Sequence, residues 1–101
     1  MRVNIEHVEN KLVLRLTGRF DGTASNSFRE AYTPGLTAED VHDFEIDLSE
    51  VEFVDCTALG TLLILRQKAQ AAHKTVTLTN SPPFVNRITR LVGVDRLFTR
   101  S

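Results

Sequence analysis

Apolar and polar residues alternate along several short stretches of this chain. In residues 11–17 the three leucines point to one side, whereas Val13, Arg15 and Thr17 point to the other. Residues 43–48 and 75–80 alternate in the same way. A period of two is typical of a β-strand with one buried face. Residues 3–8 form a further strand candidate, joined to residues 11–17 by a turn near Glu9-Asn10, and we expect Gly18 to end the second strand.

Other stretches have the spacing and the boundary residues of helices. Residues 23–32 form a helix candidate, capped by Asp21 or Thr23, that we expect Pro34-Gly35 to stop. A longer helix is expected from Cys56 to about Ala72. A last helix is expected to begin at Ser81-Pro82-Pro83, because serine is a favourable N-cap and proline is tolerated in a first turn. Gly93 is placed to end it, and its apolar stripe is expected to contain Phe84, Val85, Ile88, Leu91 and Val92.

These elements predict an α/β protein with the order ββαβαβα and a short tail at Leu97-Phe98. Central strands that are covered by helices on both faces read as continuous apolar runs, whereas every strand here keeps a polar face. We therefore expect a single mixed sheet of four to five strands with helices mainly on one face. Residues 1–101 are expected to form one domain.

Composition narrows the possible functions. With 42% hydrophobic and 25% charged residues, the chain has the profile of an ordinary globular protein. The formal net charge of −1 provides no broad field to attract nucleic acid. The longest apolar run, residues 62–65, is too short to span a membrane, and residues 1–10 lack the apolar core of a signal peptide. The single cysteine cannot form an internal disulfide, so we expect a cytoplasmic protein.

The stretch Val54-Asp55-Cys56-Thr57-Ala58-Leu59-Gly60 places an acid, a thiol and a hydroxyl where a strand meets a helix. A nucleophilic cysteine needs a nearby base, and none of the three histidines has a motif that links it to Cys56. No ligand spacing for a metal and no glycine-rich phosphate loop is present. We therefore predict no catalytic residue, no metal and no cofactor, and we expect the chain not to be an enzyme.

The same junction has a structural and a regulatory interpretation. Asp55 or Thr57 can cap the helix by accepting a hydrogen bond from a free backbone N–H, which stabilises a helix by about 1 kcal/mol. A hydroxyl at a helix start is also accessible to the active site of another protein. A phosphate added there would place about −1.5 to −2 charges beside Asp55 and could expel a partner without unfolding the domain.

Three motifs resemble those of a known family. They are LTGRFD at residues 16–21, IDLSEVEFVDCTALG at 46–60 and LTNSPPFVNRITRLVGVDRLF at 78–98. Together they resemble the STAS domain of the anti-sigma factor antagonist type over nearly the whole chain. The middle motif is the most specific, because an acid, two further polar positions, a small residue, leucine and glycine follow a strand in a fixed register.

The resemblance implies a regulatory binding protein in a partner-switching pathway, with a protein kinase that is also an anti-sigma factor as its partner. In that family the kinase phosphorylates the first hydroxyl after the aspartate, and a phosphatase of the PP2C type reverses this. Transferred by position, Asp21 and Asp55 are the acidic residues that flank the site, Cys56 replaces the phosphoserine and Thr57 is the second hydroxyl. A thiol is not an ordinary acceptor for such a kinase. Either the chain binds constitutively, which we favour, or Thr57 is the acceptor; redox sensing by Cys56 is a third option.

The helix that follows the junction is expected to contact the partner. Its core stripe is predicted at Ala58, Leu62, Leu65, Ala69 and Ala72, which leaves Ile64 facing solvent. The partner contacts are predicted at Ala58, Gly60, Thr61 and Ile64. An alternative function with the same helix face is an accessory subunit of an ABC-type lipid transporter. We expect no nucleic acid partner, no membrane insertion, and a monomer or weak dimer.

Overall fold

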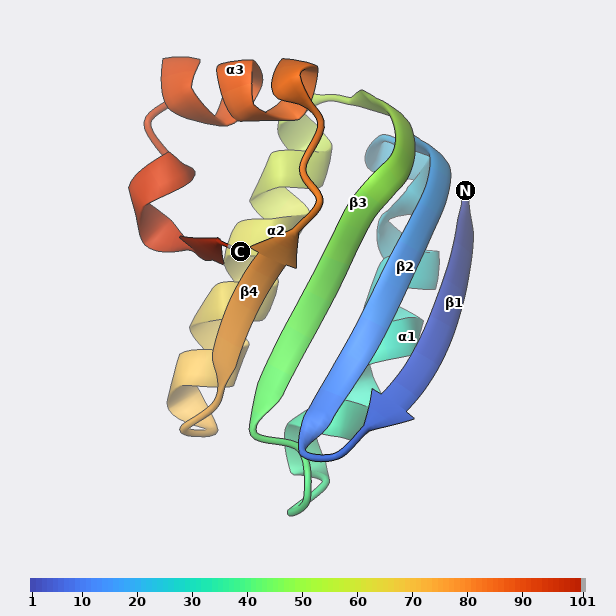
Figure 1. Cartoon of the computed structure of the whole chain (residues 1–101), viewed down its shortest axis with the longest axis vertical. Coiled ribbons are helices and arrows are strands. Elements are labelled where there is room, and N and C mark those ends of the chain that lie inside the picture. Colours follow the sequence, from blue (N-terminus) through green and yellow to red (C-terminus); the bar gives the residue numbers. More distant parts are fainter. Residues whose placement is uncertain (101) are drawn as a thin grey trace.

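The computed structural model describes residues 1–100, and its elements follow the predicted order (Figure 1). The strands are β1 (Arg2–Val8), β2 (Lys11–Phe20), β3 (Asp43–Val54), β4 (Thr75–Thr79) and β5 (Thr99–Arg100). The helices are α1 (Ser25–Thr37), α2 (Cys56–Ala71) and α3 (Pro83–Leu91), with short 3-10 turns η1 (Gly22–Ala24) and η2 (Asp95–Leu97).

The strands form one five-stranded sheet in the order β1-β2-β3-β4-β5. β1 runs antiparallel to β2, and all other neighbours are parallel. α1 and α2 cover the same face of this sheet, while α3 lies across one of its ends (Figure 1). The prediction of a mixed α/β sheet with helices mainly on one face is therefore confirmed.

The core lies between the sheet and the two long helices. The alternating leucines of β2 behave as predicted, because Leu14 and Leu16 are fully buried there. Helix α1 contributes an aromatic cluster, in which the Phe28 ring lies 5.3 Å from the rings of both Phe20 and Tyr32. This packing fixes α1 and the end of β2 relative to each other.

β2 is longer than the pattern predicted. Gly18 does not end it, because glycine adopts the positive φ of 98° that the strand requires at this point. Register shifts relative to β3 occur on both sides of Gly18, between residues 15 and 17 and between residues 18 and 19. Such bulges bend a strand without ending it. As a result β2 continues to Phe20, and the loop that follows it begins beside the end of β3.

The prediction that Pro34-Gly35 stops α1 is wrong. The helix continues to Thr37 with Pro34 inside it. The cause is tertiary packing at Gly35: a Cβ there would lie 2.7 Å from the Phe44 ring and 2.8 Å from a methyl carbon of Leu12. The absence of a side chain lets the last turn of α1 approach the sheet closely, and this contact keeps the turn helical despite the proline.

The last helix also departs from the prediction. Pro82, not Ser81, occupies the N-cap position, and no side chain caps α3. Val85 and Thr89 are buried, whereas Leu91 is 79% exposed and therefore lies outside the stripe. Gly93, with a φ of 77°, follows the helix as predicted. The expected tail at Leu97-Phe98 consists of the end of η2 and a buried Phe98 that precedes β5.

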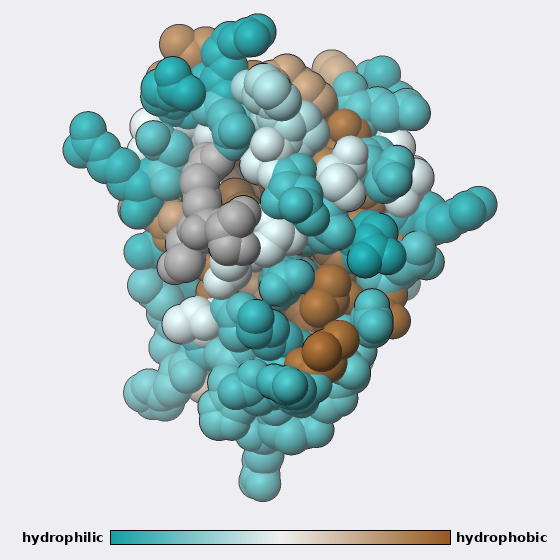
Figure 2. Space-filling model, in the orientation of Figure 1, coloured by the Kyte–Doolittle hydropathy of each residue, from teal (hydrophilic) through white to brown (hydrophobic). Residues whose placement is uncertain are grey.

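The other face of the sheet is mostly polar and faces the viewer in Figure 2, where a few apolar patches lie among the polar residues. Lys11 pairs with Glu45 across β2 and β3 at 3.6 Å, and Arg15 donates to Asp47 at 3.1 Å. Asp47 is only 6% exposed. Burial raises the pKa of its carboxyl, but hydrogen bonds from Ser49, Arg15 and Asn80 outweigh burial and leave the pKa below its ordinary value.

Candidate functional site

The junction that the sequence singled out lies at the carboxyl ends of β2 and β3. Phe20 and Val54 are paired in the parallel register of these two strands, so the loop after β2 lies beside the start of α2. A backbone hydrogen bond from Asp55 N to Phe20 O, at 3.4 Å, closes the gap between them. We call residues 19–24 together with residues 53–57 the corner.

Asp55 joins the two parts of the corner. Its Oδ1 accepts a hydrogen bond from Ala58 N at 2.8 Å, which makes Asp55 the N-cap of α2. Its Oδ2 accepts from Gly22 N at 3.4 Å, in the loop after β2. The predicted cap is therefore Asp55, and it connects two segments that are 33 positions apart in the sequence.

Asp21 has an equivalent role in the neighbouring loop. It is the N-cap of η1, and its Oδ1 accepts from Thr23 N at 3.0 Å and from Thr23 Oγ1 at 2.6 Å. The hydrogen bond from the Thr23 hydroxyl is the main cause that holds the pKa of Asp21 below its ordinary value. Arg19 lies 3.7 Å from the other carboxylate oxygen. Asp55 thus caps α2 as predicted, but the prediction that Asp21 or Thr23 caps the first helix is wrong, because Asp21 caps only η1 and α1 begins after Ala24 with no side-chain cap.

Cys56 and Thr57 are exposed at the surface of the corner. They occupy the first turn of α2, directly after the cap. Gly22 lies against Thr57: a Cβ at position 22 would be 3.3 Å from Thr57 Cγ2. The thiol and the hydroxyl therefore lie beside each other in sequence on an accessible edge, with the loop after β2 packed against one of them.

The exposed side of α2 is narrower than predicted. Ile64 is 49% exposed, as the helical spacing indicated, and Gly60 is partly exposed. Ala58 is fully buried and Thr61 is only 8% exposed, so their side chains do not reach the surface. Thr61 instead donates to Thr57 O at 3.1 Å and lies 3.0 Å from the hydroxyl of Ser25, which ties α2 to α1.

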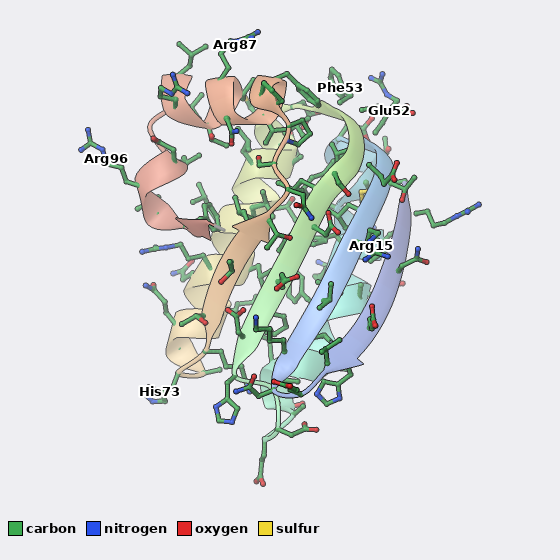
Figure 3. All side chains as sticks on the ribbon, viewed as in Figure 1. Arg15, Glu52, Phe53, His73, Arg87 and Arg96 are labelled. Carbon is green, nitrogen blue, oxygen red and sulfur yellow. The ribbon has the colours of Figure 1, made fainter. Side chains whose placement is uncertain are left out.

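Two corner residues were missed by the sequence reasoning. The guanidinium carbon of Arg19 lies 4.1 Å from the centre of the Phe53 ring, which is 36% exposed, in a cation–π contact. Figure 3 shows Phe53 and Glu52 at the same end of the sheet, at the end of β3. The sequence placed a strand before the junction, but the alternation covered only residues 43–48, so the course of residues 49–54 within β3 was not predicted. The signal that could have found it is the phenylalanine two positions before Asp55.

The histidines do not take part in the corner. His73 lies at the opposite end of the molecule from Phe53 (Figure 3), and His7 is 3.5 Å from Asp40. Within residues 1–100, no three histidine, cysteine or acidic side chains gather closely enough to hold a metal ion. In the same part of the chain, no helix combines the length and the apolar character that crossing a membrane requires.

This architecture is that of a STAS domain, with the loop after β2 and the start of α2 forming an exposed corner. A family model described as "Mlab, STAS domain" matches residues 3–99. The chain belongs to the STAS domain family. STAS-domain containing protein PA14_20770 of Pseudomonas aeruginosa (strain UCBPP-PA14) is 33% identical over 88 residues, which cover 87% of this chain and 85% of that relative.

Solved structures have the same fold. An anti-sigma factor antagonist from Mycobacterium paratuberculosis matches with a TM-score of 0.83 at 22% identity, over 98% of this chain and 83% of that chain. The anti-sigma factor antagonist SpoIIAA in its unphosphorylated form matches with a TM-score of 0.74 at 20% identity, over 89% of this chain and 83% of that chain. These similarities establish that anti-sigma factor antagonists are structural neighbours of this chain.

Proposed function

We propose that this chain is a non-catalytic regulatory protein that binds a switch kinase or anti-sigma factor through the corner and the exposed side of α2. The observation that carries the proposal is the exposure of Cys56 and Thr57 on a corner that Asp55 braces through two hydrogen bonds. A braced corner can meet a partner without a large loss of conformational entropy. Asp21 and Asp55 supply acidic groups on either side of the contact, and Gly60 and Ile64 extend it along α2.

Cys56 decides how such a protein would be regulated. A thiol at the position that the family uses for phosphoserine has nearly the size of an unmodified serine, but it is not a substrate for an ordinary serine/threonine kinase. We infer that the chain stays in its binding-competent state in the cytoplasm, where a PP2C-type phosphatase would have nothing to remove from this position.

Phosphorylation with ATP and the switch kinase that co-purifies with the chain, followed by intact mass spectrometry, tests this proposal. The wild type is expected to gain no phosphate, whereas Cys56→Ser is expected to gain one phosphate per chain. Phosphorylation of Cys56→Ser would show that the kinase reaches the corner. Addition of one phosphate to the wild type, with loss of that addition in Thr57→Ala, would replace the constitutive binder with a switch at Thr57.

A second candidate function is an accessory subunit of an ABC-type lipid transporter, which would use the same side of α2. The observation that favours it is the family model, whose description names Mlab and not an anti-sigma factor antagonist. Affinity purification with mass spectrometry separates the two candidates. Recovery of a soluble kinase supports the first, and joint recovery of an ATPase with membrane subunits supports the second.

A further inference from the structure

β1 is an edge strand with one free side. It pairs with β2 along Arg2–Val8, and no other described strand borders it (Figure 1). All of its residues are exposed except Val3, which is half-buried. The backbone N–H and C=O groups that point away from β2 are therefore available to another strand.

The side of β1 that faces the helices carries two apolar residues, a half-buried Val3 and an exposed Ile5. The register with β2 places Val3 opposite Leu16 and Ile5 opposite Leu14, on the core side of the sheet. Ile5 is nevertheless 55% exposed. Two hollows of about 330 and 360 Å³ meet at Ile5 and at Ala31 of α1. A strand added beyond β1 would bring its own side chains over these two residues.

The other side of β1 carries charges whose order is complementary to itself. Arg2, Asn4 and Glu6 alternate along it, with the cation and the anion at equal distances from Asn4. If two copies of β1 run antiparallel and are centred on Asn4, each Arg2 lies opposite Glu6 of the other copy. The same register places Val3 opposite Ile5 on the helix-facing side. A shift by two residues in either direction separates the charges and opposes Arg2 to Val8 or to Asn4.

We propose that two copies of this chain associate through β1 in this antiparallel, two-fold symmetric register and form one continuous sheet. Opposite charges directly across two strands stabilise a pair, and a closed two-fold contact uses the same surface on both copies. The interface covers Ile5 and leaves the corner and the exposed side of α2 free. The dimer would therefore present two binding corners, and its existence does not depend on which partner those corners bind.

A charge-swap series on the full chain tests the proposal by sedimentation velocity at protein concentrations up to about 1 mM. The wild type is expected to form a dimer. Arg2→Glu and Glu6→Arg each bring like charges together at both symmetric positions and should weaken the dimer about tenfold. The double variant R2E/E6R restores opposite charges and should recover the wild-type dissociation constant.

Two further variants complete the series. Ile5→Lys places a charge on the side of β1 that faces the helices and should also favour the monomer. Arg87→Glu reverses an exposed charge on α3, remote from β1 (Figure 3), and should leave the dimer unchanged. Thermal unfolding of each variant checks that the monomer remains folded. A wild type that is monomeric at every concentration, single charge variants that dimerise as tightly as the wild type, or a double variant no tighter than the singles would each overturn the proposed interface.

Discussion

Replacement of Asp55 separates the structural role of the corner from its charge. Asp55→Ala removes the cap of α2, which is worth about 1 kcal/mol, and the favourable interaction of a carboxylate with the helix N-terminus, worth about 0.5 kcal/mol. It also removes the bond from Gly22 N, whose 3.4 Å length makes it a minor contribution of about 0.5 kcal/mol. The free energy of unfolding should fall by about 2 kcal/mol.

Asp55→Asn is the informative comparison. Asparagine caps helices as well as aspartate does, and its oxygen can accept from Ala58 N. The charge is lost, and the amide NH2 that replaces Oδ2 cannot accept from Gly22 N, so the free energy of unfolding should fall by about 1 kcal/mol. If the partner reads the acidic corner, Asp55→Asn should weaken binding far more than this small loss of stability explains.

Urea denaturation followed by far-UV circular dichroism measures both variants, provided that the m-value stays constant. Glu52→Ala removes an exposed acid from the adjacent strand and should change stability by less than about 0.5 kcal/mol. The reasoning is refuted if Asp55→Ala and Asp55→Asn are equally destabilised, because the hydrogen bond to Ala58 would then contribute nothing measurable.

Three further predictions concern the sheet and the helices. Gly35→Ala should destabilise the fold by about 1 kcal/mol net, because its clash with Phe44 exceeds the gain in helix propensity. Gly60→Ala meets no atom within 4 Å and should stabilise the fold by about 1 kcal/mol. Equal effects of the two variants in chemical denaturation would contradict the packing argument. The pKa of Asp47 is lowered in the folded state, so its contribution to stability is present above the ordinary value of 3.8 and is lost as the pH falls below that value. Asp47→Asn should therefore lose less stability in acid than the wild type does. Parallel curves of stability against pH for the two proteins would argue against this role. Ile64→Glu should abolish partner binding in titration calorimetry while the thermal midpoint stays within a few degrees, since Ile64 is half-exposed; retained affinity would exclude it from the interface.

Local sequence patterns predicted the elements that have one buried face. They failed where tertiary contacts determine where an element ends or which of its residues are exposed. The alternation in β2, β3 and β4 follows from burial on a single side, so the order of elements and the mixed sheet could be derived from it. The continuation of α1 through Pro34 could not, because it depends on the approach of Gly35 to Phe44, a residue of another element. The exposure of Leu91 has the same origin, since the orientation of α3 is set by which of its residues meets the core.

The position of the candidate site in the chain could be predicted from the sequence, but the contacts between segments that hold it together could not. The sequence placed Asp55, Cys56 and Thr57 at a strand–helix junction, and helical spacing correctly predicted that Ile64 is exposed. The contribution of Gly22 and Arg19 was not visible, because the parallel register of β2 and β3 is what brings their loop to Asp55. The burial of Thr61 likewise depends on Ser25, which belongs to a different helix.

The hydrogen bonds of Asp55 have a practical consequence for protein engineering. Because one carboxylate serves two chain segments, neither segment is an independent module. A loop borrowed from another STAS domain would fit here only if residues 19–24 and 53–58 were transplanted as a matched set. A change in the length of either one would displace the surface that the other presents.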